Sequence, residues 1–370
     1  MTGRRRDTIA FFLPTLCGGG AERVTVNLAA GLAGRGHPVD LVAAAAWGDL
    51  SGEVPEPVRL VDLRAGRVLR SVGPLMRYLR RERPRALVSA MNHANIVAIC
   101  AARLAGTGTP VIVTVHNTMS QSIPEQGRFA GGLWPHALRI FYPWAAAVVA
   151  VSRGAADDLA RTSGLRRDRV QVIYNPVLSA AMLGRASHAP QHPWFAPGQP
   201  PVVLGVGRLS GQKDFATLVR AFAQLRRARP ARLMILGEGE ERPRLEALVA
   251  ELGVAADVAL PGFRQDVLSC MAHSAVFVLS SAWEGLPTVL IEALAVGVAI
   301  VATDCPSGPK EILQDGRLGV LVPVGDAPAM ARAMERALQA GRPAAPPEDA
   351  LTPFTMDAAL DRYLQLIESA

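Results

Sequence analysis

The chain is poor in cysteine pairs, Asp-x-Asp sequences and lysine, each of which would indicate a particular kind of site. Its four cysteines lie too far apart for a C-x-x-C pair, which excludes a zinc cage or a dithiol redox motif and favours a cytoplasmic location. No Asp-x-Asp sequence occurs, so we predict that the protein works without a bound metal; we also expect no cofactor. Lysine is rare, because Lys213 and Lys310 are the only two among 39 lysine and arginine residues.

Long apolar runs are also missing. No stretch of about 18 apolar residues exists, so no membrane span is predicted. The run Ile9–Leu13 follows N-terminal arginines but ends at Pro14, and it is too short for the core of a secretory signal. We therefore predict that residues 8–13 form a first buried strand.

Positive charge is concentrated in the first half of the chain. Residues 1–190 contain 23 arginines and 12 acids, which gives +11, whereas residues 191–370 contain 16 basic and 20 acidic residues, which gives −4; the sum is the formal +7. Many of the arginines lie in Arg64–Arg85, where apolar residues recur at helical spacing. This segment is expected either to lie on an anionic membrane surface or to form a solvated helix face. No recognised nucleic-acid module accompanies it, so we expect no nucleic-acid binding.

The remaining composition is that of a globular α/β protein. Half of the residues are hydrophobic and 19% are charged, and the length is sufficient for two domains. Short apolar runs alternate with helical patterns, which predicts parallel sheets. The predicted strands of the first half are Thr8–Leu13, Val39–Ala44, Ala86–Ser89, Val111–Val115, Ala146–Val151 and Val170–Ile173. Those of the second half are Val202–Val206, Arg232–Leu236, Val258–Leu260, Val276–Leu279, Ala299–Ala302 and Val320–Val322.

The most informative motif is Ser280–Ala293. A buried strand ends at its start, a loop carries Glu284, and Pro287 stands where a helix begins. The free N–H groups of the first helical turn form an anion site that suits a diphosphate. Glu292, one turn later, points back toward this helix start and is placed to accept hydrogen bonds from ribose hydroxyls. The residues expected at the ligand are Glu284, Gly285, Leu286, Pro287, Thr288 and Glu292; the alternative is a surface loop with chance acids.

A second motif supplies positive charge. The strand Val202–Val206 is followed by a loop that contains Arg208 and Lys213, both expected at the C-terminal edge of the sheet. A paired arginine and lysine can neutralise the charge that develops on a departing diphosphate, as a metal ion would. Taken alone, the same loop is also consistent with a solvated turn.

The other strand ends carry weaker signals. The loop Gly18–Gly20 lets the backbone approach a phosphate or a sugar closely, but Arg23 breaks the dinucleotide fingerprint G-x-G-x-x-G, so an NAD site is not favoured. His116 directly follows a strand, although a lone histidine is more often structural. Further strand ends suited to backbone contacts with a nucleobase carry Gly237, Phe263 and Arg264.

Together, these residues resemble the retaining glycosyltransferases of family 4, and the resemblance spans essentially the whole chain. It implies an α/β GT-B fold, in which two Rossmann-like parallel-sheet domains face each other across a cleft. The expected domains are an acceptor-side domain (1–176), a linker (177–201), a donor domain (202–353) and a C-terminal helix that packs back on the first domain (354–370).

The resemblance also implies roles for individual residues. Arg208 and Lys213 hold the donor diphosphate, Glu292 binds ribose, and Glu284 contacts the donor sugar. Gly19, Gly20 and His116 complete the site from the acceptor side. The residues expected to be catalytic are Glu284, His116, Arg208 and Lys213, and the other residues named above are expected to bind the donor.

The expected activity is retaining, metal-independent sugar transfer. Residues 302–312 are similar to a subgroup that builds polysaccharides and lipid-linked oligosaccharides, often from UDP-sugars. The chain departs from the common family pattern Asn-Gly-Val-Asp at Tyr174–Val177, which leaves one local contact in doubt. The expected partners are a nucleotide sugar, a glycan or lipid-linked acceptor, and a membrane surface at Arg64–Arg85. The alternative is a catalytically silent sugar-nucleotide-binding or scaffold protein of the same fold.

Overall fold

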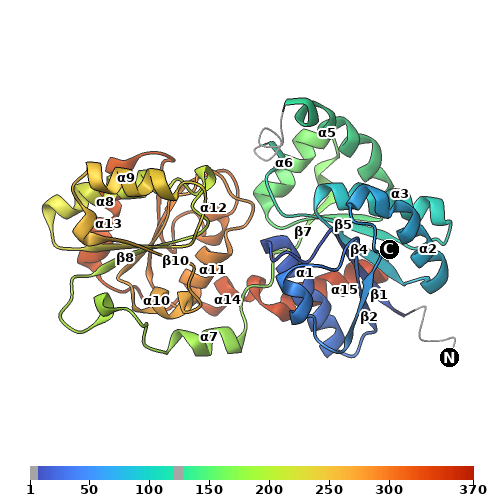
Figure 1. The fold of residues 1–370 in the computed structure, drawn as a ribbon, viewed down its shortest axis with the longest axis horizontal. Coiled ribbons are helices and arrows are strands. Elements are labelled where there is room, and N and C mark those ends of the chain that lie inside the picture. Colours follow the sequence, from blue (N-terminus) through green and yellow to red (C-terminus); the bar gives the residue numbers. More distant parts are fainter. Residues whose placement is uncertain (1–6, 121–127) are drawn as a thin grey trace. The chain divides into compact units, whose positions relative to one another are not determined.

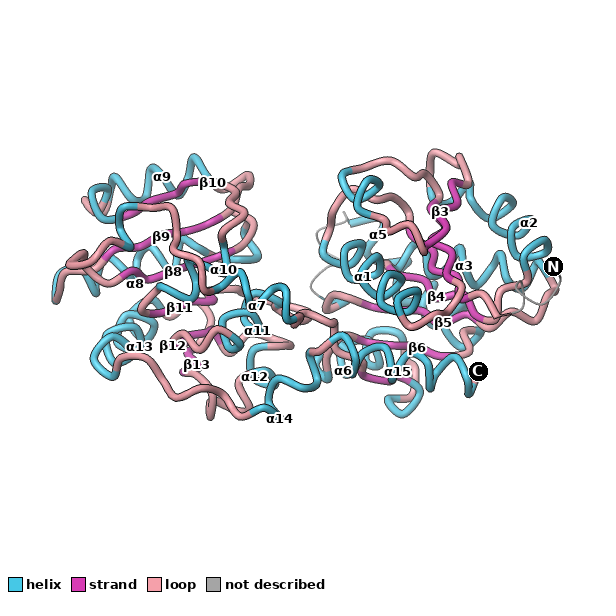
Figure 2. The backbone as a smooth tube through the Cα atoms, turned by 90° about the horizontal axis from the view of Figure 1, so that it is seen from below, coloured by secondary structure: helices cyan, strands magenta, loops and turns pink. Residues whose placement is uncertain are grey.

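The computed structural model describes residues 7–120 and 128–370, which fall into two compact units (Figure 1). Unit 1 comprises Met1–Pro176 and Met356–Ala370, and unit 2 comprises Val177–Thr355. Each unit is built on its own parallel sheet, whose strands are drawn in magenta in Figure 2. Two parallel-sheet α/β units are the fold class that the alternation of strands and helices predicts, so that prediction is confirmed.

The sheet of unit 1 has seven strands in the order β3-β2-β1-β4-β5-β6-β7. They are β1 (Ile9–Leu13), β2 (Val39–Ala43), β3 (Val58–Asp62), β4 (Ala86–Ala90), β5 (Val111–Val115), β6 (Ala147–Ala150) and β7 (Val170–Val172). The central strands are buried on both faces, which is why they appear in the sequence as apolar runs. The strand β3 was not predicted, because this edge strand is largely exposed and therefore lacks such a run.

Helices cover both faces of this sheet. They are α1 (Gly20–Gly34), α2 (Val72–Glu82), α3 (Asn92–Ala105), α5 (Arg128–Phe141), α6 (Arg153–Ser163) and α15 (Met356–Ser369). The last helix, α15, packs against α1, where its Leu360 approaches Gly31 so closely that a Cβ on the glycine would lie 2.9 Å from Leu360 Cδ1. Arg35 of α1 also pairs with two acids of α15, Asp357 and Asp361.

The arginine-rich segment contains α2, and its apolar residues face inward. Leu75, Tyr78 and Leu79 are buried in the core of unit 1. Tyr78 donates a hydrogen bond of 2.6 Å from its hydroxyl to buried Asp40 of β2, which also accepts one from Arg59. The apolar face of this helix is therefore occupied by the protein's own core.

The sheet of unit 2 has six strands in the order β10-β9-β8-β11-β12-β13, all of which lie where the sequence predicts strands. They are β8 (Val202–Val206), β9 (Arg232–Leu236), β10 (Val258–Gly262), β11 (Val276–Leu279), β12 (Ala299–Thr303) and β13 (Val320–Val322). The helices are α7 (Ala180–Ala186), α8 (Phe215–Ala228), α9 (Arg242–Glu251), α10 (Val267–His273), α11 (Thr288–Ala295), α12 (Pro309–Ile312), α13 (Ala327–Ala340) and α14 (Glu348–Leu351).

Residues 177–201, for which we predict a linker, form part of unit 2. They contain α7, which packs against α10, and the hydroxyl of Ser269 in α10 donates a hydrogen bond to the carbonyl of His188. The lack of a helical pattern in the sequence is explained by the shortness of α7, which spans seven residues. This segment consequently supplies side chains to unit 2.

Candidate functional site

The central feature of unit 2 is a buried ion pair at the C-terminal edge of its sheet. Lys213 Nζ lies 2.5 Å from Glu284 Oε1, and the hydroxyl of Ser281 donates a hydrogen bond of 2.7 Å to the same oxygen. The two charged side chains are only 17% and 7% exposed. Lys213 and Glu284 are 71 positions apart in sequence, and the structure brings them together.

Further hydrogen bonds hold the two loops that carry this pair. The amide of Gln212 donates to the carbonyl of Trp283 at 2.9 Å, and the backbone N–H of Ala282 donates to the carbonyl of Gln212 at 2.8 Å. The hydroxyl of Ser280 donates to the carbonyl of Lys213 at 2.7 Å. Hydrogen bonds thus connect the loop after β8 with the loop after β11 and hold Lys213 beside Glu284.

The helix α11 begins beside this pair. Pro287 is its N-cap residue and Thr288 its first residue, so the amide groups of the first turn are available to an anion. Gly308 packs against this start, because a Cβ on it would lie 2.4 Å from the Cδ atom of Pro287. The hydroxyl of Ser307 donates to the carbonyl of Gly285 at 2.8 Å. Part of the 302–312 segment therefore supports the loop that leads into α11.

Glu292 lies one turn into α11, as predicted. Burial raises the pKa of this carboxyl to about 7, and the nearby guanidinium of Arg185, from α7, opposes that rise. Desolvation disfavours the ionised form of an acid, which is the sense of the shift. A hydroxyl-rich ligand that donates hydrogen bonds to Glu292 would stabilise its carboxylate.

Arg208 lies on the same loop as Lys213, but its side chain is 76% exposed. Its Nε atom is 3.6 Å from Oε2 of Glu240, a surface acid that follows β9. The backbones of these two loops touch: a Cβ on Gly237, whose φ is 140°, would lie 2.0 Å from the carbonyl oxygen of Gly207. Gly237 is therefore required for this packing, while Arg208 is an exposed cation at the edge of the site.

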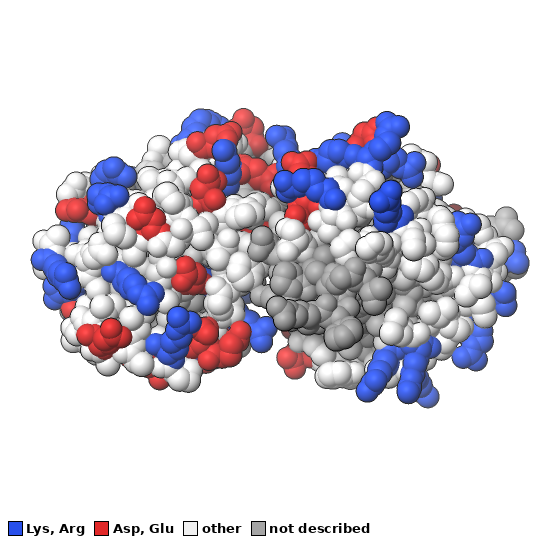
Figure 3. All heavy atoms as spheres, turned by 90° about the horizontal axis from the view of Figure 1, so that it is seen from above, with Lys and Arg blue, Asp and Glu red and all other residues white. Residues whose placement is uncertain are grey.

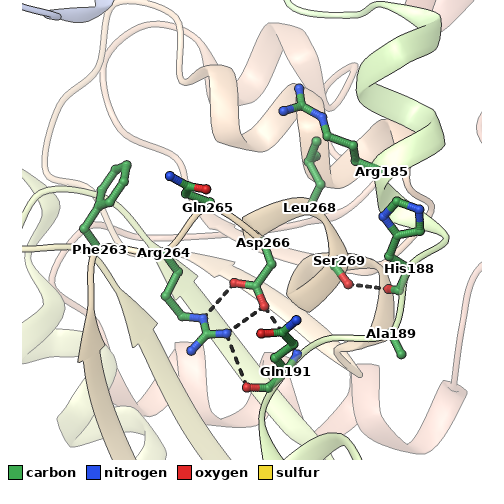
Figure 4. A pocket seen from close by; sticks show the side chains of 10 residues that line it. All are labelled: Arg185, His188, Ala189, Gln191, Phe263, Arg264, Gln265, Asp266, Leu268 and Ser269. Carbon is green, nitrogen blue, oxygen red and sulfur yellow. Dashed lines mark hydrogen bonds and ion pairs between the residues drawn. The ribbon is translucent and has the colours of Figure 1, made fainter. Parts of the chain in front are cut away.

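A pocket of about 490 Å³ opens between the loop after β10 and the segment that contains α7 (Figure 4). Phe263, which directly follows β10, lies on its wall with 79% of its surface exposed. Gln265 and Arg185 also line it. An exposed aromatic ring beside a polar side chain is a combination suited to stacking and hydrogen bonding with a nucleobase.

Arg264 lines the same pocket, but its guanidinium is already engaged. Its Nε and Nη2 atoms each donate to a carboxylate oxygen of Asp266 at 2.7 Å, and Nη2 also donates to the carbonyl of Gln191 at 3.3 Å (Figure 4). This arginine lowers the pKa of the Asp266 carboxyl. The side chain of Arg264 therefore joins the loop after β10 to residues 177–201 and shapes the pocket.

In unit 1, the glycine loop stands between β1 and α1. Gly19 is the N-cap residue of α1, and its N–H donates a hydrogen bond of 2.7 Å to Glu22 Oε2. The other carboxylate oxygen of Glu22 accepts one from the hydroxyl of Thr15. Glu22 is buried and braces the loop, whereas Gly20 has open space where a Cβ would be.

His116 follows β5 at the same edge of the sheet as the glycine loop. Its Nε2 atom lies 3.1 Å from the hydroxyl oxygen of Thr114, and its Nδ1 atom is buried without a hydrogen-bond partner among the described residues. Burial lowers the pKa of His116 to about 4, so the imidazole is neutral at pH 7.

Several residues of the site were not identified from the sequence. Ser281 lies in the motif Ser280–Ala293, but its hydrogen bond to Glu284, three residues later, depends on the bent conformation of this loop. Arg185 lies in the short helix α7, for which the sequence has no helical pattern, and no sequence signal links it to Glu292. Glu22 alone had a recognisable position, three residues after an N-cap glycine, which is the spacing of a capping interaction.

Comparison with known proteins connects this geometry to a family. Residues 18–178 match the family Glycosyltransferase Family 4, and residues 191–348 match Glycosyl transferases group 1. The lipopolysaccharide core biosynthesis glycosyltransferase LpsE of Rhizobium meliloti is 36% identical over 178 residues, which are 47% of this chain and 51% of that protein. The matched region thus spans about half the length of that relative.

Two other similarities extend over most of the chain. The Campylobacter jejuni protein named "GalNAc-alpha-(1->4)-GalNAc-alpha-(1->3)-diNAcBac-PP-undecaprenol alpha-1,4-N-acetyl-D-galactosaminyltransferase" is 27% identical over 342 residues, 89% of this chain and 88% of that protein. The crystal structure of Anabaena Alr3699/HepE in complex with UDP has a TM-score of 0.77 at 20% identity and covers 98% of this chain and 100% of its own. The latter similarity shows the fold.

The two parallel-sheet, Rossmann-like units have the GT-B fold. Both halves match the corresponding family descriptions, with residues 18–178 matching one and residues 191–348 the other. The chain belongs to the family 4 glycosyltransferases of the GT-B fold.

Proposed function

We propose that the protein is a retaining glycosyltransferase that moves a hexose or an N-acetylhexosamine from a UDP-sugar to a hydroxyl of a glycan or lipid-linked saccharide. The observation that carries the proposal is the buried pair of Lys213 and Glu284, 2.5 Å apart, beside the start of α11. A cation fixed next to a helix N-terminus is suited to bind and stabilise a leaving diphosphate.

The donor would be held along one edge of unit 2. Its diphosphate would meet the ammonium group of Lys213 and the first amide groups of α11, with Arg208 available at the exposed side. Its ribose would donate hydrogen bonds to Glu292. Its base would enter the pocket lined by Phe263 and Gln265, whose volume of about 490 Å³ is within the range of small-ligand sites.

The arrangement supports transfer without a metal. Lys213 and the helix amides provide the positive potential that a divalent ion would otherwise supply to the departing UDP. Glu284 Oε1 already accepts hydrogen bonds from Lys213 and Ser281, so this oxygen is held in place to receive donor-sugar hydroxyls rather than freed as a covalent nucleophile. We infer attack by the acceptor hydroxyl on the face that the phosphate leaves, with the phosphate oxygen accepting the hydroxyl proton.

The choice of substrates rests on relatives and on residues 302–312. Structures of Anabaena HepE contain UDP and UDP-glucose, and the name of the Campylobacter jejuni relative specifies a saccharide on diphospho-undecaprenol. The other named relative acts in lipopolysaccharide core biosynthesis. A UDP-sugar and a lipid-linked or lipopolysaccharide-type acceptor are therefore the substrates proposed for this chain.

A transfer assay tests the proposal. The purified protein would be incubated with UDP-glucose, UDP-galactose, UDP-GlcNAc or UDP-GalNAc, with lipid-diphosphate saccharides as acceptors, and with EDTA. We expect product with the α-anomeric configuration of the donor, and we expect Lys213→Ala and Glu284→Ala each to lower turnover by at least about 100-fold. Lys310→Ala, at the other lysine of the chain, is the matched control and should retain activity.

Two results would contradict the proposal. Near-normal turnover in both Lys213→Ala and Glu284→Ala would show that the site is placed wrongly. Tight UDP-sugar binding by calorimetry without product across the acceptor panel would favour the silent, sugar-nucleotide-binding alternative.

We also propose that unit 1 contacts an anionic membrane surface through the arginines of Arg64–Arg85. The apolar side of α2 is buried, so the contact with the membrane would be mainly electrostatic. Leu69 is the one large hydrophobic residue of this segment that is exposed, with 73% of its surface accessible. On the face drawn in Figure 3, the described part of unit 1 shows more basic than acidic side chains. Among the described residues, no helix is long and apolar enough to cross a bilayer.

Vesicle co-sedimentation tests this contact. The protein should bind vesicles that contain phosphatidylglycerol and be released by about 0.5 M salt, since exposed charges are screened at that ionic strength. Replacing exposed Arg70 and Arg77 with glutamate should weaken binding, whereas Arg227→Glu, an exposed site on unit 2, should not. Equal binding to neutral phosphatidylcholine vesicles would contradict the proposal.

A further inference from the structure

The surroundings of His116 contain a hydroxyl group with two polar neighbours and only one hydrogen to donate. Thr114 is the fourth residue of β5, and its side chain is buried. Its Oγ1 atom lies 3.0 Å from the backbone carbonyl oxygen of Ser89 in β4 and 3.1 Å from Nε2 of His116. A carbonyl oxygen can only accept, whereas a neutral imidazole nitrogen can either donate or accept.

The direction of these two hydrogen bonds follows from that difference. If Thr114 donates to Ser89, its lone pair accepts a hydrogen bond from a protonated Nε2. If Thr114 instead donates to Nε2, two oxygen lone pairs face each other at 3.0 Å and the contact with Ser89 becomes unfavourable. The first arrangement satisfies both neighbours of Thr114, and the second satisfies only one.

The other ring nitrogen points to the same arrangement. Nδ1 of His116 is buried and has no hydrogen-bond partner among the described residues. With Nε2 protonated, Nδ1 carries a lone pair, whereas in the other tautomer it would be a buried N–H without an acceptor. Unpaired buried N–H donors are rarer in proteins than under-satisfied acceptors. Burial also keeps the ring neutral at pH 7, since it lowers the pKa of His116 to about 4.

We propose that Thr114 is a positioning residue that holds His116 in the Nε2–H tautomer, so that Nδ1 accepts a hydrogen bond from a substrate hydroxyl. The assignment of the tautomer depends only on the contacts described above. The assignment of a hydroxyl as the group that donates to Nδ1 rests on the proposed function, since sugars supply hydroxyl donors. His116 would then orient a sugar and would take no part in proton transfer through Nε2.

Nitrogen-15 NMR of histidine-labelled protein at pH 7 tests the tautomer directly. Long-range proton–nitrogen spectra distinguish a protonated ring nitrogen from one that carries a lone pair, and the His116→Gln variant identifies the His116 signals. We expect Nε2 to carry the proton in the wild type. We expect Thr114→Val, which removes the hydroxyl but keeps the branched shape, to shift both nitrogen signals toward a mixture of tautomers, and Thr114→Ser to restore them.

A buried threonine elsewhere in unit 1 provides the control. Thr25 in α1 is buried and donates its hydroxyl hydrogen to the backbone carbonyl of Ala21 at 2.8 Å, so Thr25→Val removes a similar hydrogen bond. This change should leave the His116 signals unmoved. A wild-type protein with the proton on Nδ1 would overturn the proposal, as would a Thr114→Val protein that keeps the wild-type His116 signals.

Kinetics tests the consequence for substrate binding separately. Thr114→Val should lower kcat/KM by about tenfold, the effect of one misdirected hydrogen bond, and Thr114→Ser should recover most of it. An inactive protein with the expected tautomer would contradict the proposed glycosyltransferase function and leave the tautomer established. An active protein with the opposite tautomer would contradict the role of Thr114 alone.

Discussion

Replacing Lys213 with methionine should destabilise unit 2 much more than a lysine substitution usually does. The partner carboxylate of Glu284 is 7% exposed and would keep its hydrogen bond of 2.7 Å from the hydroxyl of Ser281, but it would lose the charge of the ammonium group. Removing one member of a buried ion pair typically costs 3–5 kcal/mol, because the remaining charge stays buried without compensation. Since Lys213 is 17% exposed and water can partly replace it, we expect the lower value, about 3 kcal/mol.

Differential scanning calorimetry of the full chain measures this effect. For a unit of this size, each kcal/mol shifts the melting temperature by about 2–4 °C, so Lys213→Met should lower the transition of unit 2 by about 6–12 °C. Lys310→Met is the matched control: Lys310 lies 3.9 Å from Asp315, and the two side chains are 61% and 82% exposed. Exposed pairs contribute about 0–1 kcal/mol, so this change should move the transition by less than about 4 °C.

The double variant decides whether the pair itself is responsible. Because Lys213→Met and Glu284→Gln together leave no buried charge, the double variant should be more stable than Lys213→Met alone by about 1–3 kcal/mol. UDP at about 100 times its Kd should raise the wild-type transition by a free energy of about 2.7 kcal/mol, and it should raise the Lys213→Met transition less at the same concentration. A Lys213→Met protein that melts within about 2 °C of the wild type would refute the role of the buried pair. So would a double variant whose loss of stability equals the sum of the losses in Lys213→Met and Glu284→Gln.

Three other changes should give defined results. Burial raises the pKa of Glu292 to about 7, above that of the unfolded carboxyl, so this group lowers the free energy of unfolding as the pH rises from about 4.5 to about 7. Glu292→Gln should remove up to about 3 kcal/mol of this pH-dependent loss of stability, as measured by urea unfolding at about pH 5 and pH 8. The same pH dependence in the variant and the wild type would contradict this prediction. Phe263→Ala should weaken UDP binding by roughly 5- to 150-fold in calorimetry, the range for loss of one base–aromatic stack, whereas Leu183→Ala, at an exposed residue of α7, should not. Asp40→Asn should lower the free energy of unfolding in urea by about 1.5–3 kcal/mol, because buried Asp40 accepts a charge-assisted hydrogen bond from Arg59 and another hydrogen bond from Tyr78. An unchanged midpoint of urea unfolding would show that these hydrogen bonds do not stabilise the protein.

Some positions in the site were predictable because the governing interaction is local. A strand that is buried on both faces needs a run of apolar residues, and a helix that follows it begins a few residues later. The C-terminal ends of parallel strands meet at one edge, so the loop with Lys213 after β8 and the loop with Glu284 after β11 were expected at the same edge of the sheet. The same argument placed Gly19 and His116 at one edge of the sheet in unit 1.

Other features of the site depend on contacts between residues far apart in the sequence, and these contacts cannot be derived from the spacing of residue types. The helical spacing within Arg64–Arg85 indicated an apolar face but not what that face packs against, and the structure shows that Leu75 and Leu79 lie in the core of unit 1. Arg264 was expected to bind the donor; its guanidinium is bound to Asp266, two residues away, and to the backbone at Gln191. Arg208, expected beside the diphosphate, has its guanidinium next to surface Glu240.

The two-sheet architecture and the loops that carry charge were predictable from the amino-acid order, because burial periodicity and strand ends are properties of short segments. The pairing of the charges, and the choice of the His116 nitrogen that faces Thr114, depend on the folded structure. Those outcomes depend on distances of a few ångströms between residues that are up to 71 positions apart, as for Lys213 and Glu284, and such distances are set by the packing of whole strands and helices.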